Sequence, residues 1–406
     1  MGLKNDRYFD DGRHLARFFM LSVCVFFLLN FFGCKTPVEN KRTQIGISGK
    51  DQPSVRRVPT EEGPNTPTTD TAGNQFYKLL SSDTSAFVGR ECERPRKTIR
   101  LRKSGAYALE NAFLMSSFFS GTEKYTREEL TKMLEASGFD KIAWVIDEGV
   151  DVFSFIAVNK ELAVVHFRGT SNLNGWLKNS VVLPVQASRD GFGLKGKIHK
   201  GFFDAYKTVK EEFERKLAES VDKDLPLYFT GHSLGGALTT VAGARAALEG
   251  FQVASVYTGG QPRLGDAEFS SYVESLFSGN HFRLVYEDDM VARIPPTSQG
   301  SSEAAKLLVR QRLFSQANGV LQAVVSPLFQ NAGYVHLGKQ LLLGQEGVRL
   351  QPSVSTELED LEFWSKWGQQ LNVIAGAADI FSTDLIKDHA SIQYMCSLSR
   401  EVNKSF

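Results

Sequence analysis

A serine between two glycines is the feature of this sequence best suited to chemistry. The stretch follows an apolar run from Leu227, and it reads Gly231-His232-Ser233-Leu234-Gly235. Small residues and a helical pattern come directly after it. This strand–turn–helix context is typical of a nucleophile elbow, in which a strained turn exposes the serine hydroxyl and the next backbone N–H. Ser233 is therefore a candidate nucleophile for acyl transfer, and Leu234 a candidate oxyanion donor. Gly-Ser-Gly patterns also recur by chance, so the interpretation depends on partner residues elsewhere.

A second oxyanion donor is expected from a loop that follows an earlier strand. The apolar run ending in Phe167-Arg168 is followed by Gly169-Thr170. Thr170 is placed to supply a backbone N–H, with its hydroxyl as a further candidate donor. One such donor typically contributes about a hundredfold to a thousandfold in rate. The sequence thus predicts an oxyanion hole made by Thr170 and Leu234.

The segments around the elbow alternate between the two kinds of secondary structure. Besides the elbow strand, strands are expected at residues 150–158, 161–168, 253–257 and 281–286. Helices are expected at residues 105–119, 202–220, 303–328 and 357–377. The first two strands are separated by Asn159-Lys160, which predicts a hairpin with Asn at positive φ. Alternating strands and helices indicate an α/β fold in one domain.

Composition limits the classes of function. The chain has 406 residues, a formal net charge of +1, 42% hydrophobic residues and 30 phenylalanines. A nucleic-acid-binding protein needs a strongly basic face, so the balanced charge argues against that class of partner. The apolar content is enough for a large core, and no obligate protein partner is inferred.

The first 34 residues have the features of an export signal. Basic residues lead into an uncharged run from Phe18 to Gly33, and Cys34 follows at once. This arrangement is typical of a secretory signal. Gly33-Cys34 also resembles the lipobox of bacterial lipoproteins, which implies lipidation of Cys34. The following Lys35 favours the outer membrane over the inner one in a Gram-negative cell. The alternative is an uncleaved N-terminal signal anchor. Either way, we expect an exported protein held at a membrane of the cell envelope.

Residues 35–75 form a different kind of segment. Prolines alternate there with serine, threonine and charged residues, and no aromatic residue occurs from Lys35 to Asn74. Such a composition cannot bury enough apolar surface to order itself. We therefore predict a disordered tether over residues 35–75 and a folded domain over residues 76–406.

Five ordered blocks together resemble the class 3 lipases, the fungal-type lipase family. They are His166-Phe167-Arg168-Gly169-Thr170, Ile198-His199-Lys200-Gly201-Phe202, Thr230-Gly231-His232-Ser233-Leu234-Gly235-Gly236-Ala237, Gly260-Gln261-Pro262-Arg263-Leu264-Gly265-Asp266 and Asp288-Asp289-Met290-Val291-Ala292-Arg293-Ile294-Pro295-Pro296. The resemblance is dense over residues 165–296 and loose outside them. It implies an α/β-hydrolase fold, with a central, mostly parallel sheet, a nucleophile elbow and flanking helices. It also implies a triad in the order serine, acid, histidine.

Two aspartates compete for the acid of that triad. Asp266 lies in the Gly-x-Pro-Arg-x-Gly-Asp block, which is structural in the family. Asp289 matches the position at which the family carries its acid, at the end of a strand. Its neighbour Asp288 would point the other way along a strand. The resemblance therefore favours Asp289.

Two histidines follow Asp289 and compete for the base. His336 resembles a tyrosine-x-histidine block that the family carries between its acid and its base. His389 lies in a late stretch like the loop that holds the family's catalytic histidine and opens the last helix. Loops suit this role because the imidazole must reach both the serine and the carboxylate. The resemblance favours His389, and His166 and His199, which match family blocks, are interpreted as structural. His232 is not expected to be the base, because a side chain next to the nucleophile at a sharp turn cannot easily face its hydroxyl.

The residues after Thr170 occupy the position of the family's lid, a short amphipathic helix over the active site. Leu173, Trp176 and Leu177 are spaced at i, i+3 and i+4, so they share one face of a helix. An apolar lid face would favour action at a bilayer or a droplet. The alternative is an ordinary surface helix docked on the core.

Four cysteines occur in the chain. Cys24 lies in the predicted signal, and Cys34 is the predicted lipidation site. Secreted members of the family commonly join the two ends of the domain with a disulfide, which implies a Cys92–Cys396 pair here. Two free thiols are the alternative, less expected in an oxidising compartment.

These inferences predict a membrane-tethered serine hydrolase that cleaves carboxylic esters of lipids, with a lipid at a membrane or droplet as its substrate. Ser233 would attack, His389 would take its proton, and Asp289 would orient the imidazole. The reaction needs no metal or cofactor. Two alternatives stay open: a phospholipase A-type or lysophospholipase activity, and a catalytically silent lipid-binding lipoprotein on a hydrolase scaffold.

Overall fold

The computed structural model describes the part of the chain that holds the elbow and all five resembling blocks. The described residues are 92–93, 95–96, 99, 101–103, 105–170, 183–297, 333–344, 347–351, 362–366 and 387–405. All of them belong to one compact unit, Ser54–Phe406. The predicted signal, the predicted tether, the expected helix at 303–328 and most of the expected helix at 357–377 lie outside the described residues; residues 362–366 are helical.

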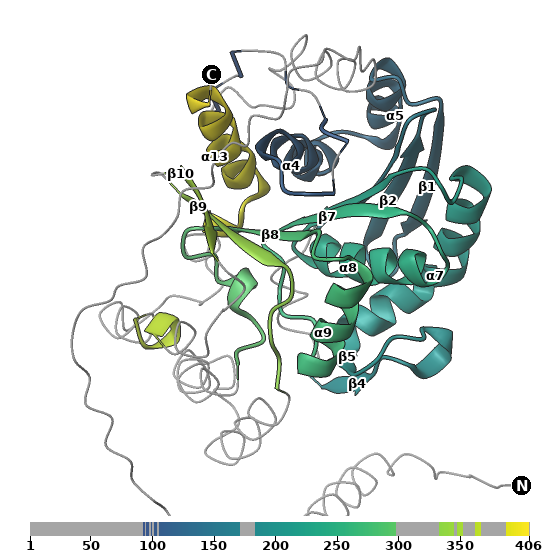
Figure 1. Cartoon of the computed structure of the whole chain (residues 1–406), viewed down its shortest axis with the longest axis vertical. Helices are drawn as coiled ribbons and strands as arrows, with labels where there is room; N and C mark the ends of the chain where they lie inside the picture. The colour runs from purple at the N-terminus through teal and green to yellow at the C-terminus, as the bar shows by residue number, and fades with distance from the viewer. Residues whose placement is uncertain are drawn as a thin grey trace, which may run out of the picture. The chain divides into compact units, whose positions relative to one another are not determined.

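An eight-stranded sheet runs through the unit in the order β1-β2-β3-β6-β7-β8-β9-β10 (Figure 1). Pairing is parallel from β3 to β9 and antiparallel at both edges. The strands are β1 Lys141–Asp147, β2 Val152–Val158, β3 Ala163–Phe167, β6 Leu227–His232, β7 Val253–Gly259, β8 His281–Tyr286, β9 Lys339–Gly344 and β10 Gly347–Gln351. Strands β4 Pro184–Gln186 and β5 Lys197–His199 form a separate antiparallel pair.

Helices cover both faces of the sheet (Figure 1). One face packs against α7 Lys200–Ser220, α8 Leu234–Leu248 and α9 Ala267–Leu276, and the other against α4 Leu109–Lys124, α5 Arg127–Ala136 and α13 Ser391–Lys404. Short 3₁₀ turns in the described part of the chain are η1 Arg189–Gly191, η2 Val291–Arg293 and η3 Lys387–His389. The result is a three-layer α/β/α arrangement with an apolar core on each side of the sheet.

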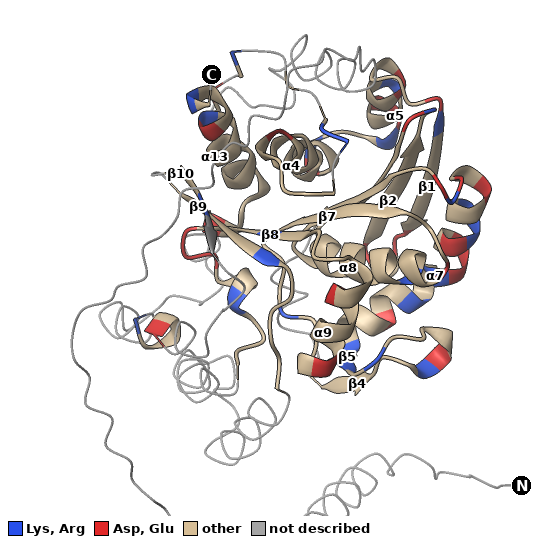
Figure 2. Ribbon diagram, viewed as in Figure 1, with Lys and Arg blue, Asp and Glu red and all other residues tan. Residues whose placement is uncertain are grey.

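The residue pattern of each element explains which layer it occupies. In β6, Phe229 packs on the α8 side and Tyr228 on the α4 side, because successive side chains of a strand point to opposite faces. Helix α8 is buried almost all round, which its run of small and apolar residues allows. Helix α7 buries one apolar stripe and carries acidic and basic residues on its outer side (Figure 2). The elbow between β6 and α8 therefore lies between two packed layers.

Most of the predicted elements are confirmed, with shifted ends. β8 has the predicted bounds, and α7 begins two residues before the predicted start at Phe202. The first predicted helix, at 105–119, runs instead from Leu109 to Lys124. The predicted hairpin is the antiparallel pair β2–β3. The role predicted for Asn159 was wrong: it is not at positive φ, and its Oδ1 instead accepts hydrogen bonds from the N–H groups of Glu161 and Leu162.

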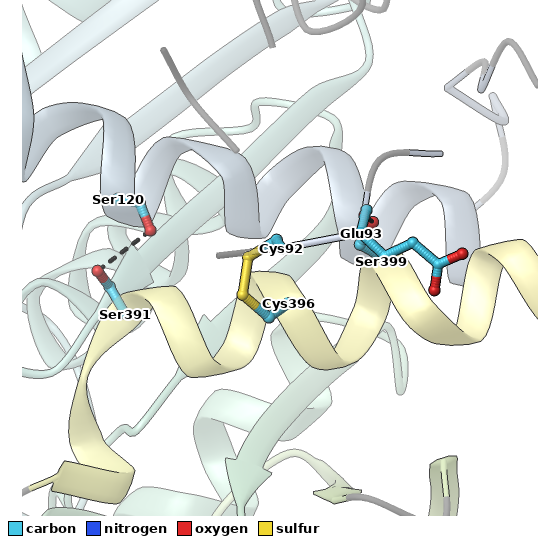
Figure 3. Close-up of a disulfide and its surroundings, with 6 residues drawn as sticks. All are labelled: Cys92, Glu93, Ser120, Ser391, Cys396 and Ser399. Atoms are coloured by element: carbon cyan, nitrogen blue, oxygen red, sulfur yellow. Dashed lines mark hydrogen bonds between the residues drawn. A yellow bond between two sulfur atoms is a disulfide. The ribbon is translucent and has the colours of Figure 1, made fainter. Parts of the chain in front are cut away.

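A disulfide joins Cys92 to Cys396, whose Cα atoms are 4.9 Å apart (Figure 3). Cys396 lies in α13, so the bond ties this helix to a segment 304 residues earlier in the chain. Nearby, Ser399 Oγ donates to the carbonyl of Glu93, and the backbone N–H of Arg96 donates to Asn403 Oδ1 at 2.8 Å. The last helix is thus fixed to the start of the described domain by covalent and polar contacts.

Removing this disulfide is expected to lower the free energy of unfolding. The closed loop is long, so the double variant Cys92→Ser/Cys396→Ser should lose about 2–5 kcal/mol. Denaturant or thermal unfolding of the parent and the double variant measures the difference. Reductant should lower the midpoint of the parent and leave that of the double variant unchanged. An equal midpoint for the parent and the double variant, each with and without reductant, would show that the disulfide contributes nothing to the free energy of unfolding.

Candidate active site

Ser233 sits at the sharp turn between β6 and α8. Its backbone has φ 58° and ψ −128°, a conformation that residues other than glycine rarely adopt. The backbone N–H of Ser233 donates to the carbonyl of Gly259 at 2.8 Å, which ties the turn to the end of β7. The residue is only 4% exposed. The sequence predicted a strained turn at this position, and the hydrogen bond to Gly259 anchors it.

Gly235 shows why a glycine follows the serine. A Cβ atom at this position would lie 2.1 Å from the carbonyl oxygen of Phe167 and 2.5 Å from that of Arg168. No side chain fits such a separation, so only glycine lets α8 begin directly against the end of β3. The close approach brings the loop after β3 beside the elbow.

The two residues predicted for the oxyanion hole flank this contact. Leu234 is the first residue of α8, and the first N–H groups of a helix have no acceptor within the helix. Gly169, which precedes Thr170, lies so close that a Cβ there would be 3.3 Å from Ser233 Cβ. The Thr170 hydroxyl donates to Asp151 Oδ2 at 2.7 Å. Because that hydroxyl proton is engaged, the backbone N–H is the better candidate donor of Thr170.

Asp151 anchors the loop after β3 from the β1–β2 turn. Besides Thr170, its carboxylate accepts a hydrogen bond from Arg168 Nη2 at 2.8 Å. The Arg168 guanidinium also lies 4.8 Å from the ring of Phe153. No sequence motif marks Asp151, since only the pairing of β2 with β3 brings it to Thr170.

Asp289 lies in the turn after β8, three residues beyond the end of that strand and fully buried. Its Oδ1 accepts from the backbone N–H of Val291 at 2.8 Å. Its Oδ2 accepts from the Tyr394 hydroxyl and lies 2.8 Å from His389 Nδ1. Burial opposes ionisation, but the charge and hydrogen bond of His389 and the bond from Tyr394 outweigh it and lower the pKa of Asp289. The carboxylate is therefore ionised and held at both oxygens.

His389 ends the 3₁₀ turn η3, two residues before α13, and is 4% exposed. One ring nitrogen meets Asp289, and no hydrogen bond engages the other, Nε2, among the described residues. A Cβ on Gly260 would lie 2.7 Å from His389 Cε1, so the ring packs directly on this glycine backbone. Gly260 follows Gly259, whose carbonyl holds the Ser233 turn. The imidazole is thus placed beside the elbow by the loop after β7.

Replacing Gly260 with alanine is expected to disturb this packing. The residue has φ 56°, and the new methyl group would also approach Asp289 Oδ2 to 2.9 Å. Displacing an imidazole by about 1 Å can cost about a hundredfold in rate. Gly250→Ala is the matched control, since Gly250 also has positive φ but its Cβ would meet only Lys223 Nζ, at 3.8 Å. Steady-state turnover of both variants tests the prediction, and equal losses would contradict it.

The competing acids have other contacts. Asp266 caps α9, accepting from the N–H of Phe269 at 2.9 Å. Asp288 is paired with Lys366 at 2.7 Å and is 43% exposed on its side chain. Among the described contacts, neither meets His389.

The other candidate histidines make their contacts elsewhere, either in the core or at the start of a helix. His166 Nε2 lies 2.9 Å from Thr122 Oγ1, and burial lowers the pKa of His166 to about 3. His199 accepts from the N–H of Gly201 at the start of α7. Burial, together with three nearby arginines, lowers the pKa of His336 well below its ordinary value. The described contacts do not join His336 to Asp289.

Tyr394 is a further residue of the site that sequence reasoning missed. Burial and the adjacent Asp289 carboxylate raise its pKa well above the ordinary value, so the phenol stays protonated and donates. Its position, five residues after His389 and near the start of a predicted last helix, was the only available signal.

Some predicted residues lie outside the described part: Leu173, Trp176 and Leu177 of the proposed lid, and Cys34. Within the described ranges, no group of three or more His, Cys, Asp or Glu side chains is arranged to hold a metal ion. In the same ranges, no helix has the length and apolar character needed to cross a membrane.

The sheet order, the parallel core and the elbow between β6 and α8 define the α/β-hydrolase fold. Residues 164–299 match the family model "Lipase (class 3)". All five blocks of the sequence lie within these bounds.

Curated proteins with similar sequences include two fungal lipases. The chain is 36% identical over 149 residues to a lipase of Rhizomucor miehei, covering 34% of this chain and 39% of that protein. It is 34% identical over 135 residues to a secreted mono- and diacylglycerol lipase of Fusarium solani, covering 33% of this chain and 39% of that protein. The matched stretch thus spans about two fifths of the length of these relatives. Of solved structures, a triacylglyceride lipase of Rhizomucor miehei aligns with a TM-score of 0.43 and 20% identity, over 70% of this chain and 94% of that chain.

Proposed function

We propose that the protein is a serine hydrolase that cleaves carboxylic esters of lipids, as triacylglycerol lipases do. The observation that carries the proposal is the convergence of the Ser233 elbow with the Asp289–His389 hydrogen bond around the Gly259-Gly260 loop. These residues lie on separate elements and are nearly or fully buried. The class 3 lipase match supports the same chemistry.

In the proposed acylation step, Ser233 Oγ attacks the ester carbonyl while His389 Nε2 takes its proton. The backbone N–H groups of Leu234 and Thr170 stabilise the oxyanion. Asp289 keeps His389 in the required tautomer, because its carboxylate accepts the Nδ1 proton. Collapse of the intermediate breaks the ester bond, and His389 returns the proton to the departing alcohol. This leaves an acyl group on Ser233.

In the deacylation step, His389 removes a proton from water, and the resulting nucleophile attacks the acyl carbonyl. The carboxylic acid leaves, and the proton returns to Ser233 Oγ. No metal or cofactor takes part. The complete set of nucleophile, base and acid argues against a silent binding scaffold.

Glycerides are the favoured substrates. The Rhizomucor relative is a lipase, and the Fusarium relative is a secreted mono- and diacylglycerol lipase. The secreted relatives, the disulfide and the apolar N-terminal run together support export. Anchoring through lipidated Cys34 is the form of export that the Gly33-Cys34 sequence favours. The apolar spacing of Leu173, Trp176 and Leu177 supports a lid that would open at a lipid surface.

A substrate panel tests the proposal. Purified protein is incubated with triolein, a monoacylglycerol, phosphatidylcholine, lysophosphatidylcholine and a soluble short-chain ester, and released acid is titrated. Release of fatty acid from the glycerides is expected, at a higher rate than from the phospholipids. Faster release from the phospholipids would favour the phospholipase alternative. No release from any substrate, by protein that is folded by circular dichroism, would contradict ester hydrolysis.

A further inference from the structure

His232, next to the candidate nucleophile, packs face to face on His389. The two ring centroids are 4.6 Å apart with an interplanar angle of 27°. His232 reaches this position because it continues the alternation of β6 on the side of the sheet that faces α4. Phe119 of α4 and Tyr394 of α13 lie 5.5 and 5.4 Å from its ring. The His232 side chain is only 4% exposed, and its ring forms one wall of the His389 site.

Glu123 reaches the same imidazole from the last turn of α4. Its Oε1 lies 3.6 Å from His232 Nδ1, a charge–dipole distance and not a hydrogen bond. Its Oε2 accepts a hydrogen bond from Ser391 Oγ at 2.6 Å. Ser391 begins α13, two residues after His389. Glu123 therefore contacts both the strand that leads to Ser233 and the helix that follows His389.

The charged and titratable groups that act on His232 come from four elements. They are Glu123 of α4, His166 of β3, Asp289 after β8, and His389 and Tyr394 around the start of α13. Burial and the charge of His389 lower the pKa of His232, while Glu123 and Asp289 oppose them. Burial raises the pKa of Glu123, but His232 and the bond from Ser391 lower it overall. At neutral pH the pair is thus a carboxylate beside a neutral imidazole.

We propose that Glu123, acting through His232, is a positioning residue for His389, and this inference rests on the proposed hydrolysis. His389 must carry a positive charge in the transition state. Asp289 stabilises that charge from the ring edge, and the Glu123–His232 pair does so across the ring face. Because His232 is neutral, His389 can take up a proton beside it. A protonated His232 would instead repel the positive charge that forms on His389. Because Glu123 is 43% exposed on its side chain, solvent weakens its effect.

Glu123→Gln removes the charge and keeps the shape. The expected results are a loss in kcat of about three- to tenfold and an acid limb of the kcat/KM profile lowered by about 0.3–1 pH unit. The profile is measured on a soluble ester, which avoids effects of a lipid surface. Ser391→Ala is the matched control, because it removes the hydrogen bond to Glu123 and keeps the carboxylate. Its acid limb should coincide with that of the parent.

A second measurement does not depend on turnover. Ring signals of ¹⁵N-histidine-labelled protein are titrated, with His232 assigned by its absence in His232→Gln. Glu123→Gln should lower the titration midpoint of His232 still further below that of the parent. Unchanged kinetics together with an unchanged His232 midpoint would overturn the inference, and so would an equal acid-limb shift in Ser391→Ala. If the parent hydrolysed no ester, the proposed function would fail, and the His232 titration would still test the electrostatic link.

Discussion

Replacing Ser233 with alanine is expected to abolish ester hydrolysis while leaving the fold intact. Loss of the nucleophile in a serine triad lowers kcat by on the order of 10⁵–10⁶-fold. Only stabilisation by the oxyanion donors and binding would remain. The turn itself should persist, since it is set by the hydrogen bond from the Ser233 N–H to Gly259 and by the close packing at Gly235. Turnover and thermal unfolding of the same preparation measure both quantities.

A buried serine on the neighbouring strand provides the control. Ser255 of β7 is fully buried, and its hydroxyl has no hydrogen bond among the described residues. Ser255→Ala therefore removes a comparable group outside the site, and its turnover should stay close to that of the parent. Parental turnover in Ser233→Ala would end the functional proposal.

The pair His389→Ala and His336→Ala is expected to separate the two candidate bases. His389→Ala should lower kcat by at least about 10⁴-fold, because Ser233 would lose its proton acceptor. His336→Ala should keep most of the turnover and lose about 1–2 kcal/mol of unfolding free energy. Its ring lies among Arg263, Arg283 and Arg293, away from the described contacts of Asp289.

Kinetics and unfolding of the two folded variants decide between these roles. An active His389→Ala beside an inactive His336→Ala would reverse the assignment. Loss of activity in both variants would leave neither histidine assigned. Asp288→Asn, a change at a partly exposed neighbour of Asp289, then shows whether any substitution near the acid lowers activity.

The elbow could be predicted from the sequence because its physics is local. Glycines, a serine and a strand–helix change of pattern lie within ten residues, and the structure places Ser233 at a strained turn. The central strands could also be predicted, since buried parallel strands are continuous apolar runs in the sequence. The edge strands β1 and β10 were missed, and so was β9, although β1 has the aromatic and β-branched residues of a strand.

The acid and the base of the triad could not be predicted from the local sequence pattern. Their side chains meet across 100 residues of sequence, and family resemblance alone selected Asp289 and His389. Contacts with no family motif were missed altogether. Tyr394 is separated from Asp289 by 105 residues, and Glu123 from Ser391 by 268. Such long-range pairs follow from the packing of α4 and α13 on one face of the sheet, which no periodicity reveals.

The most direct test of the central claim is covalent trapping of the nucleophile with a fluorophosphonate. Such a probe phosphonylates a serine that is activated by a neighbouring base. Intact mass and peptide mapping of the treated protein should show one adduct, on Ser233, and Ser233→Ala should show none. An unmodified folded protein, or an adduct on another residue that persists in Ser233→Ala, would contradict the assignment of this chain as a serine hydrolase.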